Sequence, residues 1–259
     1  MLNSVFCRPM AHRGLHDARR NVIENTGPAF EAAIAGGFGI ECDLQPAAAG
    51  LPVVFHDETL DRLVDGNGSV ASLGSDDLAR LKHRGSGAPI LTFAQFLALV
   101  AGRVPLLVEI KSEWLPPDGV FLGEIAWQVR AYKGPLALMS FDPAVMAVMR
   151  ELAPAVPRGI VSGSYEGEGW WGDALSPERR FALSQLLESG PAAPDFYAYQ
   201  VAALPTPITR YVREVQRLPL LTWTVRQAAD WATALTHADA PIFEGVVPPT
   251  AAALRNWQR

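Results

Sequence analysis

The stretch GIECDLQ, residues 39–45, reads as a buried β-strand, yet it carries two acids close to its end. A second stretch, PLLVEIK at residues 105–111, is also strand-like and ends in an acid and a lysine. Ionised side chains are rarely left buried without a partner. Each stretch therefore predicts a strand that brings charged groups to a place where something neutralises them.

Apolar, strand-like runs alternate with segments of helical period along the whole chain. The predicted strands are Arg8–Arg13, Gly39–Gln45, Pro105–Lys111, Leu136–Phe141, Arg158–Gly163, Phe196–Val201, Pro219–Val225 and Ile242–Val247. The predicted helices are Thr26–Ala35, Phe93–Ala101, Phe121–Tyr132, Pro143–Leu152, Pro177–Ser189, Pro207–Gln216, Arg226–Thr236 and Thr250–Trp257. Three helix starts are marked by a capping side chain before a proline, at Asp142, Ser176 and Thr206.

Strands that each precede a helix predict an α/β fold, here a single TIM-type (βα)8 barrel domain over residues 1–259. An open doubly wound sheet is the alternative, but no Gly-rich loop follows the first strand. Leu51–His56 does not fit the alternation and predicts a hairpin with the second strand, turning at AAAG, residues 47–50. Glu58–Pro89 then forms a small insertion after the second strand, too short for a separate domain.

The composition, with 49% hydrophobic and 19% charged residues, is that of a globular protein. A formal net charge of −5 argues against nucleic acid as a partner and against an anionic membrane surface. No window approaches the roughly 18 apolar residues of a membrane span, so we expect no stable membrane anchoring. Cys7 and Cys42 are too few for a disulfide scaffold, and we expect a cytoplasmic protein with reduced thiols. The oligomeric state is left open.

Titratable residues stand where four of the strand-like runs end. The first predicted strand ends in His12 and Arg13, and the hairpin strand ends in His56. Residues two apart on a strand share a face, so Glu41 points with Asp43, and Glu109 with Lys111. In a barrel of this type the strand ends meet at one rim, which is where the chemistry lies.

Three carboxylates at one rim predict a divalent cation, because Mg²⁺ and Ca²⁺ prefer oxygen ligands. The chain has no thiolate pair, which disfavours structural zinc. Arg13 and Lys111 beside such an ion describe a phosphate site. His12 and His56 add two groups that give and take protons near neutral pH. Together these side chains predict metal-assisted cleavage of a phosphodiester.

The same residues fall in an ordered set of motifs that resembles the glycerophosphodiester phosphodiesterase family. The motifs are AHRG at 11–14, ENT at 24–26, IECD at 40–43, VVFHD at 53–57 and VEIK at 108–111, with a weaker echo in LTWTV at 221–225. The resemblance implies a TIM-type barrel that hydrolyses glycerophosphodiesters to sn-glycerol 3-phosphate and an alcohol. The stretch FEGVVPPT, residues 243–250, departs from the family pattern, and we expect it to be structural.

The resemblance also implies a role for each site residue. Glu41, Asp43 and Glu109 would bind one divalent cation, Mg²⁺ or Ca²⁺. His12 and His56 would be the acid/base pair, with His12 slightly favoured as the base. Arg13 and Lys111 would contact the phosphate of a small-molecule glycerophosphodiester.

Plainer interpretations stand beside these roles. Lys111 also fits a structural ion pair with Glu109, and Glu24 a loop residue, although it could orient a site group. Two other functions are open: a lysophospholipase D or sphingomyelinase D-like enzyme acting on lipid headgroups, and a catalytically silent binding protein.

Histidines and tryptophans outside the motifs carry weaker expectations. His16, His83 and His237 are expected at the surface, and Cys42 under a helix. Trp170 and Trp171, with Glu166 and Glu168, either line the alcohol end of the substrate site or simply pack their own loop.

Overall fold

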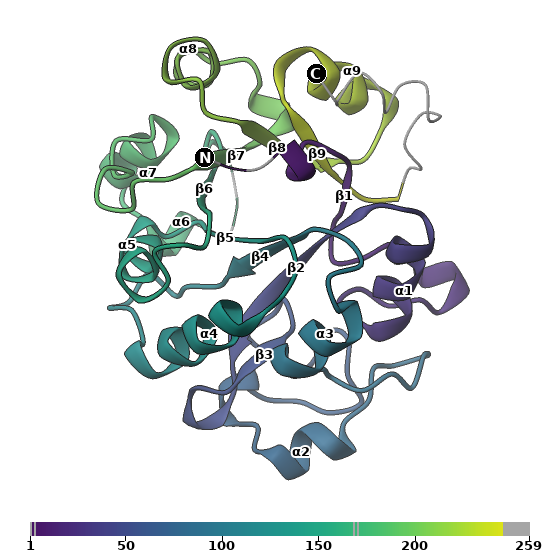
Figure 1. The fold of residues 1–259 in the computed structure, drawn as a ribbon. Coiled ribbons are helices and arrows are strands. Elements are labelled where there is room, and N and C mark those ends of the chain that lie inside the picture. The colour runs from purple at the N-terminus through teal and green to yellow at the C-terminus, as the bar shows by residue number, and fades with distance from the viewer. Residues whose placement is uncertain (1, 3, 168, 170, 246–259) are drawn as a thin grey trace.

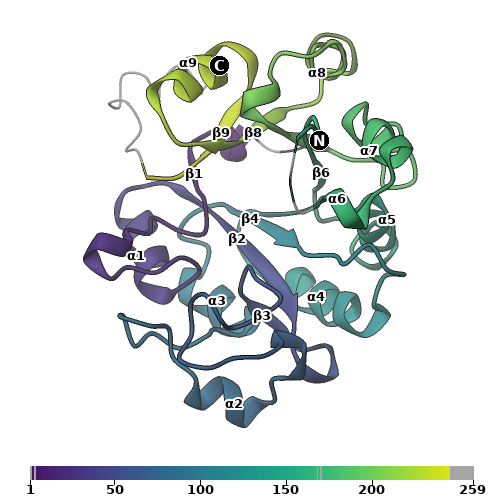
Figure 2. The same ribbon diagram turned by 180° about the vertical axis from the view of Figure 1, so that it is seen from behind.

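Eight parallel strands close into a barrel surrounded by helices in the computed structural model (Figure 1, and from behind in Figure 2). The structure describes residue 2, residues 4–167, residue 169 and residues 171–245. The barrel strands are β1 (Met10–Ala11), β2 (Gly39–Pro46), β4 (Leu106–Ile110), β5 (Leu136–Ser140), β6 (Arg158–Ser162), β7 (Phe196–Gln200), β8 (Leu220–Val225) and β9 (Ala240–Phe243). Because β1 pairs in parallel with both β2 and β9, the ring is closed. The predicted TIM-type barrel is confirmed.

Helices on the outside of the ring connect the strands. They are α1 (Gly27–Ala35), α2 (Ser75–Arg80), α3 (Phe93–Val100), α4 (Gly119–Ala131), α5 (Pro143–Leu152), α6 (Trp171–Ala174), α7 (Pro177–Ser184), α8 (Pro207–Tyr211), which continues as a π-helical turn at Val212–Gln216, and α9 (Ala228–His237). The side chains of Asp142, Ser176 and Thr206 cap α5, α7 and α8 as predicted. The predicted helix Thr250–Trp257 lies outside the described residues.

Two hydrophobic clusters hold the barrel, one on each face of its strands. Alternate residues of β4 show the division: Leu106, Val108 and Ile110 pack against the helices, while Leu107 lies in the barrel interior. Phe6, which precedes β1, joins the interior cluster. A parallel strand covered on both faces is apolar on both, which explains why these runs stand out in the sequence.

The predicted hairpin is present at the end of β2. Its second strand, β3 (Pro52–Val54), runs back antiparallel to β2 after a 3-10 turn at Ala48–Gly50. Pairing continues one residue beyond β3, because the N–H of Phe55 donates to the carbonyl of Asp43. The hairpin therefore delivers His56 beside the acids of β2.

The insertion Glu58–Pro89 packs against this hairpin and contains α2, a short helix that the sequence did not predict (Figure 1). A small cluster joins Phe55 of the hairpin to Leu60 and Val64 of the insertion. These contacts fix the turn that contains Leu60 and Val64 close to the hairpin.

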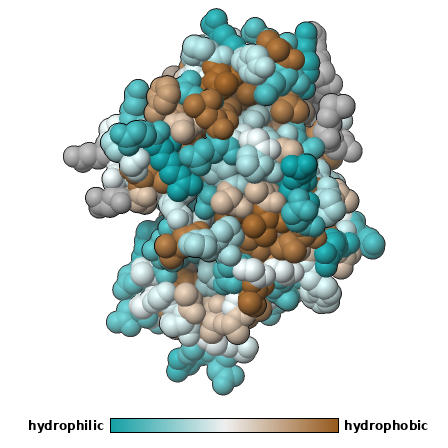
Figure 3. All heavy atoms as spheres, turned by 90° about the vertical axis from the view of Figure 1, so that its left-hand side faces the viewer, coloured by the Kyte–Doolittle hydropathy of each residue, from teal (hydrophilic) through white to brown (hydrophobic). Residues whose placement is uncertain are grey.

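Among the described residues, none of the helices is long and apolar enough to cross a membrane. Exposed large apolar side chains occur on several helices, including Trp127 on α4, Phe181 on α7 and Tyr211 on α8. On the face that carries α5 and α7, Figure 3 shows apolar patches separated by hydrophilic residues. Scattered apolar side chains of this kind are normal on a protein surface.

Candidate active site

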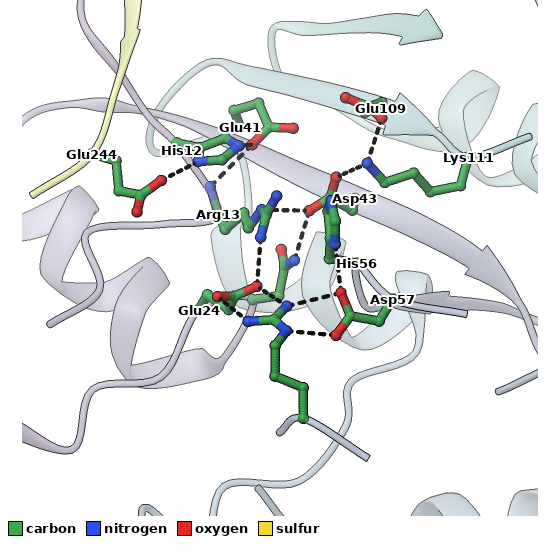
Figure 4. Close-up of polar contacts among 12 residues, drawn as sticks. His12, Arg13, Glu24, Glu41, Asp43, His56, Asp57, Glu109, Lys111 and Glu244 are labelled. Atoms are coloured by element: carbon green, nitrogen blue, oxygen red, sulfur yellow. Dashed lines mark hydrogen bonds and ion pairs between the residues drawn. The ribbon is translucent and has the colours of Figure 1, made fainter. Parts of the chain in front are cut away.

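Side chains from the ends of β1, β2 and β4 and from the hairpin meet at one mouth of the barrel (Figure 4). Six of the seven predicted site residues line a pocket of about 570 Å³ there, namely His12, Arg13, Glu41, His56, Glu109 and Lys111. The seventh, Asp43, is buried beside them and contacts Arg13 and Lys111. The structure thus brings together all seven residues.

The chain leaves β1 through a tight turn at Arg13 and Gly14. Gly14 has φ +80°, and a Cβ there would lie 2.9 Å from the backbone of Ala29, so glycine lets α1 approach. Arg13 has φ 55°, a left-handed conformation that is strained for this residue type. Its N–H donates to Oε2 of Glu41 at 3.0 Å, and its carbonyl accepts from the N–H of Asn25 at 2.9 Å. These bonds enforce the conformation that points Arg13 into the site.

Glu41, Asp43 and Glu109 form a buried group of acids. Alternation along β2 turns Glu41 and Asp43 inward, and the parallel register sets Asp43 beside Glu109. One oxygen atom from each residue lies within 4.8 Å of those from the other two. Burial, and next the charges of Asp43 and Glu109, raise the pKa of Glu41 well above its ordinary value.

Glu41 also shows what this group lacks. Its Oε1 atom is buried and has no hydrogen-bond partner among the described residues. An unused carboxylate oxygen in a group of three buried carboxylates fits a hard divalent cation, which would supply the missing positive charge. Glu41, Asp43 and Glu109 are therefore the residues that could hold a metal ion.

Two basic residues already touch these acids. Nζ of Lys111 lies 2.7 Å from Oδ1 of Asp43 and 2.5 Å from Oε1 of Glu109. Nε of Arg13 lies 3.2 Å from Oδ2 of Asp43. Burial alone would raise the pKa of Asp43, but the charges of Lys111 and Arg13 outweigh it and lower that pKa. The ion pair expected between Lys111 and Glu109 is present, and contact of Lys111 with phosphate stays a prediction.

Each histidine of the pocket is held by a carboxylate at Nδ1. His12 Nδ1 lies 2.8 Å from Oε2 of Glu244, and His56 Nδ1 lies 2.6 Å from Oδ1 of Asp57 (Figure 4). The hydrogen bond from His12 lowers the pKa of Glu244 to about 2, so that carboxylate is ionised and accepts the bond. For Asp57, burial would raise the pKa, but hydrogen bonds from His56 and Arg62 lower it instead. Both rings therefore keep Nε2 free of these carboxylates.

Glu244 is a site residue that the sequence analysis missed. It belongs to FEGVVPPT, the stretch expected to be structural, yet its side chain reaches His12. A usable signal was present, because Glu244 directly follows the apolar β9, just as His12 follows β1 and Lys111 follows β4.

Glu24 and Asn25 from the ENT motif also reach the site. Oε1 of Glu24 accepts from Nη1 of Arg13 at 2.7 Å, so Glu24 does orient a site residue, the less favoured of its two expected roles. Nδ2 of Asn25 donates to Oδ2 of Asp43 at 2.9 Å. Glu24 and Asn25 therefore hold the side chains of Arg13 and Asp43 in place through hydrogen bonds.

The expectation that His83 lies at the surface is wrong. Its exposed fraction is 1%, because the insertion folds it against the ring of Phe55, and its Nδ1 lies 3.1 Å from the carbonyl of Ala88. Cys42 packs among the residues under the helices, as expected from its place between two inward-facing acids.

Aromatic residues line the apolar part of the pocket. Trp114, Phe141 and Trp223 all contribute to its wall. Nε1 of Trp223 donates to the carbonyls of Ser162 and Ala198, both at 3.2 Å, and these bonds fix the indole ring. This wall offers an apolar surface next to the charged end of the pocket.

Trp171 is not among the residues that line the pocket. Its ring packs edge-on against Tyr165 with centroids 5.8 Å apart, as in a loop packed by its own aromatic residues. Glu166 does not line the pocket either. Trp170 and Glu168 lie outside the described residues, so the expectation for the loop is tested only at Trp171 and Glu166.

The sequence also matches a known protein family. A sequence profile of the Glycerophosphoryl diester phosphodiesterase family matches residues 12–243. The chain belongs to this family. All seven predicted site residues of this glycerophosphoryl diester phosphodiesterase family member lie inside the matched stretch, and Glu244 follows it directly.

Sequence relatives of this family member carry the same family name. The glycerophosphodiester phosphodiesterase of Caldanaerobacter subterraneus subsp. tengcongensis is 36% identical over 161 residues, which cover 59% of this chain and 65% of that protein. Glycerophosphodiester phosphodiesterase 1 of Bos taurus is 40% identical over 73 residues, or 28% of this chain and 21% of that protein. The matches therefore span less than two thirds of the length of these curated relatives.

Solved structures of the family share the fold. A glycerophosphodiester phosphodiesterase from Agrobacterium tumefaciens is similar with a TM-score of 0.65 and 22% identity over 92% of this chain and 94% of that one. A phosphodiesterase from Oleispira antarctica, solved in complex with the product sn-glycerol-3-phosphate, has a TM-score of 0.68 and 19% identity over 91% and 92% of the two chains. At these identities the likeness shows the fold that family members share.

Proposed function

We propose that this chain hydrolyses glycerophosphodiesters to sn-glycerol 3-phosphate and an alcohol, with one divalent cation, Mg²⁺ or Ca²⁺, and two histidines. The observation that carries the proposal is the convergence of three acids, two basic residues and two carboxylate-held imidazoles at one pocket. The names of the sequence relatives support it. So does the product bound to the Oleispira antarctica enzyme, which is the product expected here.

The charged end of the pocket would bind the phosphate. Glu41, Asp43 and Glu109 would hold the cation, which when bound supplies positive charge for the oxygens of the phosphoryl group in the transition state. Arg13 offers a planar fork of donors to phosphate oxygens, and Lys111 offers a compact charge. Both basic groups are held in place by the acids that they contact.

His12 suits the role of general base. Burial lowers its pKa, so the imidazole is neutral at neutral pH and can accept a proton at Nε2. Glu244 then stabilises the imidazolium that forms. The nucleophile is a hydroxyl group, either of water or of the glycerol itself by way of a cyclic phosphate, and the arrangement serves both routes.

His56 would be the general acid. As the nucleophile forms a new bond to phosphorus, the bond from phosphorus to the departing alcohol breaks, and His56 gives its Nε2 proton to that oxygen. Asp57 holds the opposite side of the ring through Nδ1. An alkoxide is a poor leaving group, so this proton is worth roughly 10²- to 10⁴-fold in rate.

The cytoplasm remains the location that we propose. Cys7 and Cys42 are both free thiols, as suits a reducing compartment.

Removal of the metal tests the proposal directly. We expect chelator-treated protein to lose hydrolysis of glycerophosphocholine and to regain it with Mg²⁺ or Ca²⁺. Glu41→Gln removes one ligand, so we expect metal affinity in calorimetry to fall by more than about 100-fold. The melting temperature of the metal-free protein should not fall, because the substitution removes a buried acid that lies beside the acids Asp43 and Glu109. Hydrolysis at full rate after chelation would contradict the proposed mechanism.

The same assay decides between the remaining functions. A lysophospholipase D or sphingomyelinase D-like enzyme would prefer micellar lysophospholipid over water-soluble glycerophosphocholine. A catalytically silent binding protein would turn over neither substrate in the presence of metal. Faster hydrolysis of the water-soluble diesters supports the function proposed here.

A further inference from the structure

Arg62 lies in the turn of the insertion that contains Leu60 and Val64. Its guanidinium binds two carboxylates next to the site, those of Asp57 and Glu24. Nε and Nη2 lie 2.6 and 2.9 Å from the two oxygens of Asp57. Nη1 and Nη2 lie 2.9 and 2.8 Å from the two oxygens of Glu24. A planar guanidinium with five donors suits such a two-sided contact.

The oxygens that bind Nη2 of Arg62 are the same ones that hold two site residues. Oε1 of Glu24 accepts from Nη1 of Arg13 at 2.7 Å, and Oδ1 of Asp57 lies 2.6 Å from Nδ1 of His56 (Figure 4). An unbroken row of hydrogen bonds therefore runs from Arg13 through Glu24, Arg62 and Asp57 to His56. Arg62 is its central member and touches neither end directly.

From Arg13 to Asp57 the charges along this row alternate in sign. Burial would raise the pKa of Glu24, but hydrogen bonds from Arg62 and the charges of Arg13 and Arg62 lower it to about 2. The hydrogen bonds that Arg62 donates to the two carboxylates raise its own pKa. Without Arg62, Asp57 would keep His56 as its one hydrogen-bond partner among the described residues, and the neighbouring carboxylates of Asp57 and Glu24 would repel each other.

The turn that carries Arg62 is held from several sides. Leu60 and Val64 are buried in the cluster shared with the hairpin. Nη1 of Arg84 donates to the carbonyl of Asp61 at 2.6 Å, and the N–H of Arg84 donates to the carbonyl of Leu63. The insertion therefore fixes the backbone from which the Arg62 side chain extends, although that side chain is 46% exposed.

We propose that Arg62 is a positioning residue, which holds the leaving-group acid His56 and the phosphate-binding Arg13 at a set separation through Asp57 and Glu24. The inference rests on the proposed function, because it takes His56 as the acid. Loss of Arg62 frees the Asp57 carboxylate to rotate, and the imidazole of His56 loses its fixed orientation toward the departing oxygen.

Two substrates with different leaving groups test this role. Choline leaves glycerophosphocholine as an alkoxide that needs a proton, whereas the p-nitrophenyl ester of glycerol 3-phosphate releases a stable phenolate that does not. We expect Arg62→Met to lower kcat/KM for glycerophosphocholine by roughly tenfold to 100-fold, but by only about threefold for the p-nitrophenyl ester. Arg62→Lys keeps the charge without the two-sided contact, so it should show the same preference. An equal fall with both substrates, or wild-type rates, would overturn the inference.

Arg84→Met is the matched control. Arg84 anchors the same turn and pairs with Asp65, but it has no contact with the row of hydrogen bonds. We expect Arg84→Met to lower the melting temperature without any leaving-group preference. If it reproduced the kinetic signature of Arg62→Met, loosening of the insertion would explain both variants, and the role of Arg62 would be overturned.

His56→Ala separates failure of this inference from failure of the proposed function. If His56→Ala shows the leaving-group preference and Arg62→Met does not, only the role of Arg62 is lost. If His56→Ala lowers both rates equally, the acid role of His56 fails, and the inference fails with it. Nitrogen-detected NMR adds a readout without turnover. Once the Nε2 proton has been given up, the neutral ring of His56 should hold its remaining proton at Nδ1 in the native protein and populate both tautomers in Arg62→Met.

Discussion

At the scale of single residues, the two histidines of the site are held in the same way. Nδ1 of His12 meets Glu244, which also pairs with Arg226 at 3.1 Å. Nδ1 of His56 meets Asp57, which in turn pairs with Arg62. In each case the carboxylate fixes one ring nitrogen as the donor, and the arginine helps to keep the carboxylate ionised. Both rings are thereby prepared to exchange a proton at Nε2.

Glu244→Gln tests this arrangement at His12. An amide carries no charge and can offer either a donor or an acceptor to Nδ1, so the tautomer of His12 is no longer fixed. We expect kcat for glycerophosphocholine to fall by roughly tenfold to 100-fold, with KM little changed, in steady-state kinetics. Glu31→Gln is the control, since Glu31 pairs with Arg103 at 2.7 Å in an exposed contact outside the pocket. A rise in KM with unchanged kcat would argue against a role in proton transfer.

At the scale of elements, β2 divides its residues between two tasks. Ile40, Cys42 and Leu44 pack under the helices, while Glu41 and Asp43 face inward. The apolar side anchors the strand in the outer layer of the core, so the acids on the other side are held rigidly. A shift of register by one residue would bury the acids under the helices and empty the site.

The start of α4 allows a test at this scale. The helix begins at Gly119 rather than at the predicted Phe121, because Oδ1 of Asp118 accepts from the N–H groups of Val120 at 2.8 Å and Phe121 at 3.2 Å. We expect Asp118→Ala to lower the free energy of unfolding by about 1 kcal/mol in chemical denaturation, with kcat unchanged. Asp118→Asn keeps an acceptor and should retain most of the stability. Equal stability of Asp118→Ala and the native protein would rule out the cap as the cause of the early start.

At the scale of the whole molecule, charge contacts tie distant parts of the chain to the barrel mouth. Arg13 follows β1, Glu24 precedes α1, and Arg62 belongs to the insertion. Glu244 adds the last described strand to the same charged region. These contacts couple stability to pH, because their carboxylates have lower pKa values in the folded than in the unfolded state.

The pKa of Glu24 defines the pH range over which this coupling changes the stability. Its pKa falls from an ordinary 4.5 to about 2 in the folded protein, so its contribution is complete above 4.5 and is lost as the pH falls toward 2. We expect Glu24→Gln to be less stable than the native protein by on the order of 2 kcal/mol at pH 7. The difference should shrink when urea unfolding is repeated from pH 4.5 down to pH 3. A difference that stays constant over this range would show that the ionised carboxylate is not its source.

The barrel and most of the site could be predicted because their signals are local. Each strand is a short apolar run, and residues such as Glu41 and Asp43 share a face by alternation alone. The ends of the parallel strands β1, β2 and β4 meet at one rim whatever the rest of the chain does, and the hairpin returns His56 to the same rim. The prediction for His83 was wrong because its burial depends on how the insertion folds back on the hairpin. No residue close to His83 in the sequence indicates that contact.

The sequence by itself determined the barrel, its hairpin and the set of seven side chains at the mouth. Only the tertiary structure decided which partner holds each of them. Glu244 lies 232 positions from His12, and Arg62 lies 38 positions from Glu24. Such contacts arise when the ring closes and the insertion docks, and a hydrogen bond between distant residues leaves no periodic trace in the chain. Pairing of β2 with β4 likewise brought Lys111 to Asp43, a partner on another strand that alternation along one strand does not specify.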